Sequence, residues 1–344
     1  MNTTKTKPII KIHFQNGLNL DGFIKDVFNI YGLPDEFEFI ESDAPDFIVF
    51  GPYGNNIPPK GNYTRIGYYC ENMMPDMSIC DWAFGVMRED EVNHPCYKKI
   101  QWHGFNPQSL IKNTDFNGDE LLAQKKHFCN FLYSHHVPYR EEFFRQLSRY
   151  KKVDAPGLSM NNMPGIDSLY QGDIWSRKRQ FLSSYKFTIA FENYVYPGYQ
   201  TEKLFDAMLA SSIPVYCGDP YINETFNTAS FLNTPDYVNI NKGATINWLE
   251  KNSQPNFVDI RPASHNSLKH QIKRKLKTLG RKLKMQKQFG SVNFKPLIDQ
   301  IVELDENDDK YLEVLNQPWL INNSLPSTLP VKNFWLKIFK QKHD

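Results

Sequence analysis

Two apolar runs flank an amphipathic segment near the middle of this 344-residue sequence, and the three together predict a βαβ unit. The runs cover residues 185–193 and 213–217 and have the length and β-rich composition of buried parallel strands. Between them, Thr201 is a helix N-cap residue. The apolar face of the predicted helix comprises Leu204, Phe205, Met208 and Leu209.

Polar residues collect where this unit would bind a ligand, at the carboxyl end of the first strand and the start of the helix. A helix N-terminus attracts anions, and Lys203 adds a full positive charge. Glu202 offers acceptors for sugar hydroxyls, and Tyr199 offers a ring and a hydroxyl. The set suits a nucleotide-diphosphate sugar and lacks the glycine patterns of dinucleotide sites and P-loops. The alternative is that Glu202 and Lys203 are ordinary first-turn charges.

The segment 181–233 closely resembles the donor-site signature of the α-1,3/1,4-fucosyltransferase family, which uses GDP-fucose. The pattern is Tyr-Lys-Phe, Phe-Glu-Asn, Tyr-x-Thr-Glu-Lys and Ile-Pro-Val-Tyr-x-Gly, with the family's spacings. The resemblance implies donor roles for four residues. Asn193 and Tyr199 would lie around the guanosine diphosphate, Glu202 on the fucose and ribose side, and Lys203 on the phosphates.

The resemblance also implies an α/β protein of GT-B architecture, with two Rossmann-like domains facing across a cleft. We expect an acceptor-binding domain over residues 1–124 and a GDP-fucose-binding domain over residues 125–320. Residues 321–344 would be a tail that returns to the first domain or lies on a membrane surface. Apolar runs predict strands in the first domain near residues 8–14, 47–51, 65–72 and 81–85.

Glu71 is the candidate general base. It lies at the polar end of the predicted strand 65–72, and inverting transfer needs a carboxylate to take the proton of the acceptor hydroxyl. The family assigns this role to the glutamate of a Glu-Asn pair at this point. Cys70 departs from the glycine that bacterial relatives often have there. The alternative for Glu71 is a solvated loop carboxylate.

Arg140 is the candidate donor-phosphate arginine, because the family places one after the strand predicted at 127–134 and before an aromatic-rich helix. A guanidinium binds a diphosphate bidentately and stays charged. The alternative is a surface ion pair with Glu141 or Glu142.

The composition of the chain indicates where the protein is located and whether it needs a metal ion. No apolar segment reaches the ~18 residues that span a bilayer, and the first residues lack the apolar core of a signal peptide. The five cysteines lack paired-ligand spacing and indicate free thiols in a reducing compartment. The histidines lack metal-helix spacing. We therefore expect a cytoplasmic protein, with or without a peripheral position on the inner membrane face, that requires no metal or other cofactor.

The resemblance to bacterial members of the family implies that residues from about 241 to 290 are an insertion. Within it, residues 267–288 hold nine of the 40 lysines and arginines and no acid, whereas the remaining chain has 31 basic and 38 acidic residues. Five aliphatic residues recur on one helical stripe: Leu268, Ile272, Leu276, Leu279 and Leu283. The pattern predicts contact with an anionic membrane. The alternatives are a stripe packed on the donor domain or, less favoured for want of aromatic residues, nucleic-acid binding.

These observations predict an inverting, metal-independent α-1,3-fucosyltransferase that moves L-fucose from GDP-fucose to the 3-OH of GlcNAc in a LacNAc-type surface glycan. Two alternatives are open: a GT-B transferase with another nucleotide sugar or α-1,4 linkage, and a non-catalytic membrane- or glycan-binding protein. The acceptor and the oligomeric state cannot be inferred from these residues.

Overall fold

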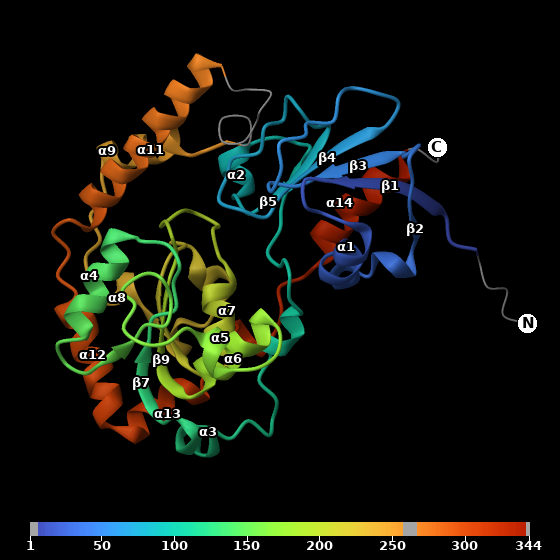
Figure 1. Cartoon of the computed structure of the whole chain (residues 1–344). Helices are drawn as coiled ribbons and strands as arrows, with labels where there is room; N and C mark the ends of the chain where they lie inside the picture. The colour runs from blue at the N-terminus through green and yellow to red at the C-terminus, as the bar shows by residue number, and fades with distance from the viewer. Residues whose placement is uncertain (1–5, 257–266, 342–344) are drawn as a thin grey trace, which may run out of the picture. The chain divides into compact units, whose positions relative to one another are not determined.

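The computed structural model describes residues 6–256 and 267–341, which form two units (Figure 1). Unit 1 combines residues 1–107, 251–281 and 326–344, and unit 2 combines residues 108–250 and 282–325. This division differs from the expected domains 1–124 and 125–320, because two later segments join unit 1. The parts of the predicted first domain, insertion and tail that fall on residues 1–5, 257–266 and 342–344 lie outside the described residues.

Unit 1 contains a parallel sheet with strand order β2-β1-β3-β4-β5-β6. Its strands are β1 (Ile9–Gln15), β2 (Glu38–Glu41), β3 (Phe47–Phe50), β4 (Thr64–Tyr69), β5 (Trp82–Gly85) and β6 (Tyr97–Lys99). The four strands predicted from apolar runs are confirmed. The two missed strands lie at the sheet edges and are short and polar, so their sequences lack an apolar run.

The helices of unit 1 are α1 (Leu20–Asp26), η1 (Phe28–Tyr31), η2 (Leu33–Asp35), α2 (Glu89–Val92) and the C-terminal α14 (Leu329–Lys340). Helices α1, η1 and α14 bury aromatic side chains, whereas α2 buries none of its residues. Trp335 of α14 is fully buried and stacks on Phe84 of β5 with ring centroids 3.9 Å apart. Phe339 of the same helix meets Phe47 of β3 edge to face at 5.1 Å. Residues 329–340 of the predicted tail are therefore part of the unit 1 core.

Unit 2 contains a second parallel sheet, with strand order β11-β10-β9-β7-β8. Its strands are β7 (His127–Asn130), β8 (Val153–Asp154), β9 (Tyr185–Phe191), β10 (Ile213–Cys217) and β11 (Leu232–Asn233). The predicted βαβ unit is confirmed as β9, α7 (Glu202–Leu209) and β10, with Ile213 paired to Phe187. Both strands lie inside the sheet, which explains their nearly continuous apolar sequences.

The remaining helices of unit 2 surround this sheet. They are η3 (Pro107–Leu110), α3 (Gly118–Gln124), α4 (Pro138–Leu147), α5 (Ile166–Leu169), α6 (Ile174–Ser183), η4 (Ile222–Glu224), η5 (Thr228–Ser230), α8 (Thr234–Tyr237), α12 (Lys295–Glu306), α13 (Asp308–Asn316) and η7 (Ile321–Asn323). Helix α12 follows the expected insertion in the chain. Two further helices, α9 (Ala244–Ser253) and α11 (Leu268–Phe289), lie in the expected insertion and cross the boundary between the units.

The basic segment is helical, as predicted, but the alternative in which its aliphatic stripe packs on the protein is wrong. All five stripe residues of α11 are exposed to solvent. None of the helices in the described ranges 6–256 and 267–341 is long and apolar enough to cross a membrane.

Candidate active site

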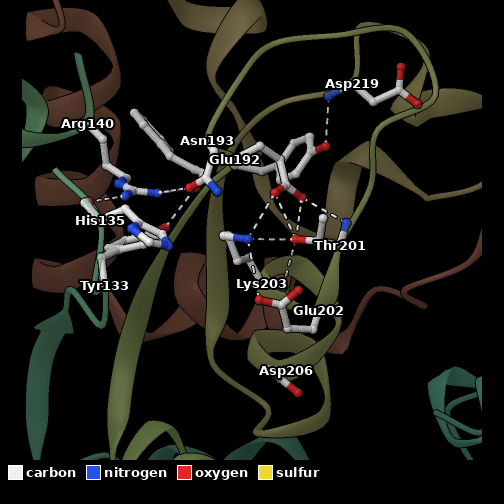
Figure 2. Close-up of polar contacts among 12 residues, drawn as sticks. Tyr133, His135, Arg140, Glu192, Asn193, Thr201, Glu202, Lys203, Asp206 and Asp219 are labelled. Carbon is white, nitrogen blue, oxygen red and sulfur yellow. Dashed lines mark hydrogen bonds and ion pairs between the residues drawn. The ribbon is translucent and has the colours of Figure 1, made fainter. Parts of the chain in front are cut away.

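The predicted βαβ unit gathers polar side chains where β9 ends and α7 begins (Figure 2). β9 ends at Phe191, Glu192 and Asn193 follow, and the chain returns through a loop to Thr201. Thr201 has extended backbone geometry, and its hydroxyl accepts a hydrogen bond from the Lys203 amide at 3.5 Å. The predicted N-cap is thus confirmed, and it positions Glu202 and Lys203 in the first turn.

Glu192 is the anchor of this cluster and is fully buried. One carboxylate oxygen accepts hydrogen bonds from the Thr201 amide at 2.8 Å and the Thr201 hydroxyl at 2.9 Å. The other lies 3.3 Å from the Lys203 ammonium. Gly218 makes room for the carboxylate, because a Cβ there would lie 2.6 Å from Glu192 Cγ. Glu192 is the glutamate of the Phe-Glu-Asn pattern and was assigned no role from the sequence; its signal was its position directly after a buried strand.

Lys203 is held between two carboxylates and a hydroxyl. Its Nζ lies 2.9 Å from Thr201 Oγ1, 3.3 Å from Glu192 and 3.4 Å from Glu202. Burial by itself would lower the pKa of Lys203, but Glu192 and Glu202 outweigh it and raise the pKa above its ordinary value. The ammonium therefore stays charged at any working pH, at a helix N-terminus that also attracts anions.

Glu202 is the more accessible carboxylate, with 43% of its side chain exposed. It lies 3.4 Å from Lys203 and 4.0 Å from Lys178, whose ammonium also pairs with Asp206 at 2.6 Å. Burial of the carboxyl group raises the pKa of Glu202, but the charges of Lys203 and Lys178 together with hydrogen bonds to the carboxylate lower it by more, so the net shift is downward. Glu202 is therefore a stable acceptor for hydroxyl groups.

Arg140 belongs to a second group beside this cluster, with Tyr133, His135 and Asn193 (Figure 2). Its guanidinium donates to the carbonyls of His135 at 2.6 Å and Phe191 at 3.3 Å, and to Asn193 Oδ1 at 3.1 Å. It also lies 3.5 Å from the centroid of the Tyr133 ring. The side chain thus packs inside unit 2 instead of forming the alternative surface ion pair with Glu141 or Glu142.

The burial of Arg140 bears on the prediction that its guanidinium binds the donor diphosphate directly. The residue is 0% exposed, and among the described residues its Nε has no hydrogen-bond partner. Its observed contacts are with carbonyl and amide oxygens and with a ring, none of which carries a net charge. The charge can act on an anion at the end of β9 through the low-dielectric interior, and the hydrogen bond to Asn193 fixes that side chain.

The loop between β9 and α7 is fastened by Asp219, which the sequence did not single out. The Asp219 carboxylate accepts hydrogen bonds from the Gly198 amide at 2.9 Å and the Gln200 side chain at 2.7 Å. Gly198 has a φ of +83°, a conformation that favours glycine. Tyr199, a predicted donor contact, lies between these residues and is only 4% exposed. The signal for Asp219 was the Gly-Asp-Pro turn after β10.

Glu71, the predicted base, belongs to unit 1 and follows β4 closely. Its carboxylate accepts a hydrogen bond of 3.4 Å from the Tyr53 hydroxyl, which also lies 3.4 Å from the Cys70 sulfur. The Glu71 side chain is half-buried. The structure thus brings Arg140, Asn193, Glu202 and Lys203 together in unit 2, with Tyr199 in their loop, and places Glu71 at the end of a strand in unit 1.

Across the residues that the structure describes, no group of three or more histidine, cysteine, aspartate or glutamate side chains could hold a metal ion. Metal independence itself stays a prediction, because a metal can arrive with a nucleotide.

Comparison with known proteins connects this site to a family. Residues 122–257 match the model for the C-terminal part of glycosyltransferase family 10 (fucosyltransferase). The chain is 36% identical over 218 residues to a putative fucosyltransferase of Acanthamoeba polyphaga mimivirus, covering 62% of this chain and 34% of the relative. It is 35% identical over 229 residues to an alpha-(1,3)-fucosyltransferase of Helicobacter pylori, covering 57% and 46%. The matches thus span less than half the length of these relatives.

Solved structures agree over almost the whole chain. A crystal structure of an alpha1,3-fucosyltransferase matches with a TM-score of 0.63 at 21% identity, covering 98% of this chain and 92% of that one. A structure described as containing GDP-fucose matches with a TM-score of 0.62 at 20% identity, covering 99% and 93%. The chain has the expected GT-B fold. The predicted resemblance to α-1,3/1,4-fucosyltransferases is confirmed, and residues 122–257 are the part of the chain that matches the model of glycosyltransferase family 10.

Proposed function

We propose that this protein is an inverting α-1,3-fucosyltransferase that moves L-fucose from GDP-fucose to the 3-OH of GlcNAc in a LacNAc-type glycan. The observation that carries the proposal is a pair of cations at one end of the unit 2 sheet, of which Arg140 is fully buried and Lys203 has 15% of its side chain exposed. Arg140 lies against the Tyr133 ring, and Lys203 is close enough to affect the pKa of the same tyrosine. The N-terminus of α7 adds its partial positive charge.

This arrangement suits the departure of a nucleoside diphosphate. One further negative charge develops on the β-phosphate oxygen of GDP as its bond to the sugar breaks, and fixed cations stabilise that charge without having to reorganise. Lys203 is held by Glu192, Thr201 and Glu202, so its position is set before a donor binds. In the proposal, Arg140 and Lys203 take the place of a metal ion.

The remaining residues would orient the donor and activate the acceptor. Glu202 accepts sugar hydroxyls, and Asn193 and Tyr199 border the nucleotide. Glu71 takes the proton of the acceptor hydroxyl while that oxygen bonds to the anomeric carbon of fucose and the bond from that carbon to the GDP oxygen breaks. Attack opposite the leaving group inverts the configuration. The names of the matched relatives and of the structure with GDP-fucose support the choice of donor.

The main alternative keeps the diphosphate site and changes the sugar or the linkage. The test is a transfer assay with purified protein, LacNAc acceptor and GDP-fucose, analysed by mass spectrometry and linkage analysis, with GDP-mannose and UDP-galactose as competing donors. We expect one fucose on the 3-OH of GlcNAc and no transfer from the other donors. Transfer from another nucleotide sugar, or to the 4-OH, would select the alternative.

A non-catalytic binding protein is the second alternative. It would bind GDP or glycan in the same experiment but leave GDP-fucose intact, with neither transfer nor hydrolysis after long incubation.

A further inference from the structure

Helix α11 (Leu268–Phe289) has its aliphatic side on the outside. The five stripe residues Leu268, Ile272, Leu276, Leu279 and Leu283 are between 40% and 73% exposed. A surface helix normally buries such a stripe against its own protein. The other side of α11 holds charged and polar residues that face inward, among them Lys284 and Gln288, which are 6% exposed each.

Polar contacts explain why α11 packs with its polar side against the protein and its aliphatic side toward solvent. The Lys284 ammonium pairs with Glu250 of α9 at 2.5 Å and donates to the Val195 carbonyl at 2.8 Å. Arg281 donates to the Ser253 carbonyl at 3.5 Å, so α9 and α11 lie side by side (Figure 1). Reversing the helix would bury the leucines only by breaking the Lys284 ion pair and exposing these buried groups.

Exposed lysines border the stripe on both sides. At about 100° per residue, the stripe occupies roughly 80° of the helix surface. Lys275 and Lys282 lie on one flank of that arc, Lys269 and Lys287 lie on the other, and all four are exposed. A stripe of leucines with lysines on both flanks is the pattern of a helix that lies in the plane of a membrane surface. Lysine stems can follow the apolar side chains into the interface while the ammonium groups stay at the lipid headgroups.

We propose that α11 is a membrane-docking helix that inserts its leucine stripe into the headgroup region of an anionic bilayer. Charge complementarity selects this occupant over a second copy of the chain. Residues 267–288 carry nine basic residues and no acid, so pairing two copies along the stripe would bring like charges together. Anionic lipid instead neutralises the flanking lysines as the leucines leave water. The proposal does not depend on which sugar nucleotide the protein uses.

The test is co-sedimentation of the full-length protein with vesicles of phosphatidylcholine mixed with phosphatidylglycerol, and with vesicles of phosphatidylcholine alone. We expect binding to the mixed vesicles that falls with added salt. Replacing two stripe residues together, Leu276→Asp and Leu279→Asp, should lower the partition coefficient by at least about tenfold. The double substitution removes two apolar side chains from the bilayer interface and adds two negative charges that the anionic lipid repels. Replacing two flanking residues, Lys275→Glu and Lys282→Glu, should lower binding to the vesicles that contain phosphatidylglycerol. Binding to vesicles of phosphatidylcholine alone should not change.

The control is Leu158→Asp, which makes the same change at an equally accessible leucine outside α11 and should bind vesicles like the wild type. Calorimetry with GDP should give the same affinity for every variant, which shows that the fold is intact. The proposal fails if the wild type does not prefer anionic vesicles, or if the stripe variant binds them equally well. A second copy of the chain would be the occupant of the stripe if the wild type binds no vesicles, is a dimer in sedimentation equilibrium, and becomes a monomer when the two stripe residues are replaced. That outcome also contradicts the proposal.

Discussion

Two carboxylates, Glu192 of unit 2 and Glu71 of unit 1, differ in how many groups bind them and in how deeply they are buried. In unit 2, Glu192 is fully buried and bound by a hydroxyl, an amide and an ammonium. In unit 1, Glu71 is half-buried, and a tyrosine hydroxyl reaches it at 3.4 Å. Both residues follow a central strand of a parallel sheet.

The difference matches two chemical tasks. Groups that hold a leaving diphosphate work best when their positions and charges are fixed beforehand. A base must instead exchange a proton with an acceptor hydroxyl in every turnover, so it needs an accessible oxygen and freedom to titrate. We therefore expect substitutions in unit 2 to change nucleotide binding and stability, and substitution of Glu71 to change turnover.

The largest effect is expected for Glu71→Gln. The amide keeps the size of the side chain and removes the base, so kcat for fucosyl transfer should fall by about 10²- to 10⁴-fold. GDP affinity, measured by calorimetry, should stay at the wild-type value. Tyr53→Phe removes the neighbouring hydroxyl and is the matched control, with a much smaller loss of kcat. An unchanged kcat for Glu71→Gln would show that the base lies elsewhere.

The next effect is expected for Glu192→Gln, which breaks a buried ion pair and leaves the Lys203 ammonium with less compensation. The free energy of unfolding should fall by about 3 kcal/mol, measured by urea denaturation. Combining it with Lys203→Met removes both charges, and the double variant should recover part of the loss. Strictly additive losses would mean that the two side chains are not coupled.

Arg140→Lys should have an intermediate effect. Lysine keeps the charge but cannot reach His135, Phe191 and Asn193 together, so Asn193 loses its support. We expect GDP affinity to fall by about tenfold, which corresponds to the loss of about one charge-assisted hydrogen bond. Asn193→Ala should give a loss of similar size. If Arg140→Lys binds GDP like the wild type while Asn193→Ala does not, Arg140 does not act through Asn193.

The smallest effect concerns the thiol beside Glu71. Burial raises the pKa of Cys70 to about 12, with Tyr53 opposing and Glu71 adding to the shift. Because only the thiolate is alkylated, the iodoacetamide reaction of Cys70 should stay slow at pH 8 and accelerate about tenfold per pH unit well beyond pH 9. In denatured protein the rate should level off near the ordinary thiol pKa of about 8.5. Mass spectrometry of the labelled peptide measures both, and rapid labelling of the folded protein at pH 8 would contradict the burial.

Local features of the fold could be predicted from the sequence, and long-range ones could not. The strands around β9 and the Thr201 cap follow from apolar runs and from one hydroxyl that satisfies a helix amide. The strands β2, β6 and β11 are too short or polar to carry such a signal. That residues 251–281 and 326–344 join unit 1 depends on tertiary packing, such as Trp335 on Phe84.

The candidate site shows the same limit. Motif spacing predicted which residues gather at the end of β9, but it did not reveal that Arg140 is buried or that Asp219 fastens the loop. For α11, periodicity predicted the leucine stripe but could not tell which side faces the protein. That orientation depends on contacts with Glu250 and Val195, which are remote in sequence.

The most direct test of the central claim is calorimetric binding of GDP and GDP-fucose in the presence of a chelator, to wild type and to Lys203→Ala. If fixed cations replace a metal, the wild type binds both nucleotides without divalent ions. The substitution then weakens binding by about 100-fold, because it removes a charge aimed at the diphosphate. Binding that requires a divalent metal, or that is the same in Lys203→Ala, would contradict the account.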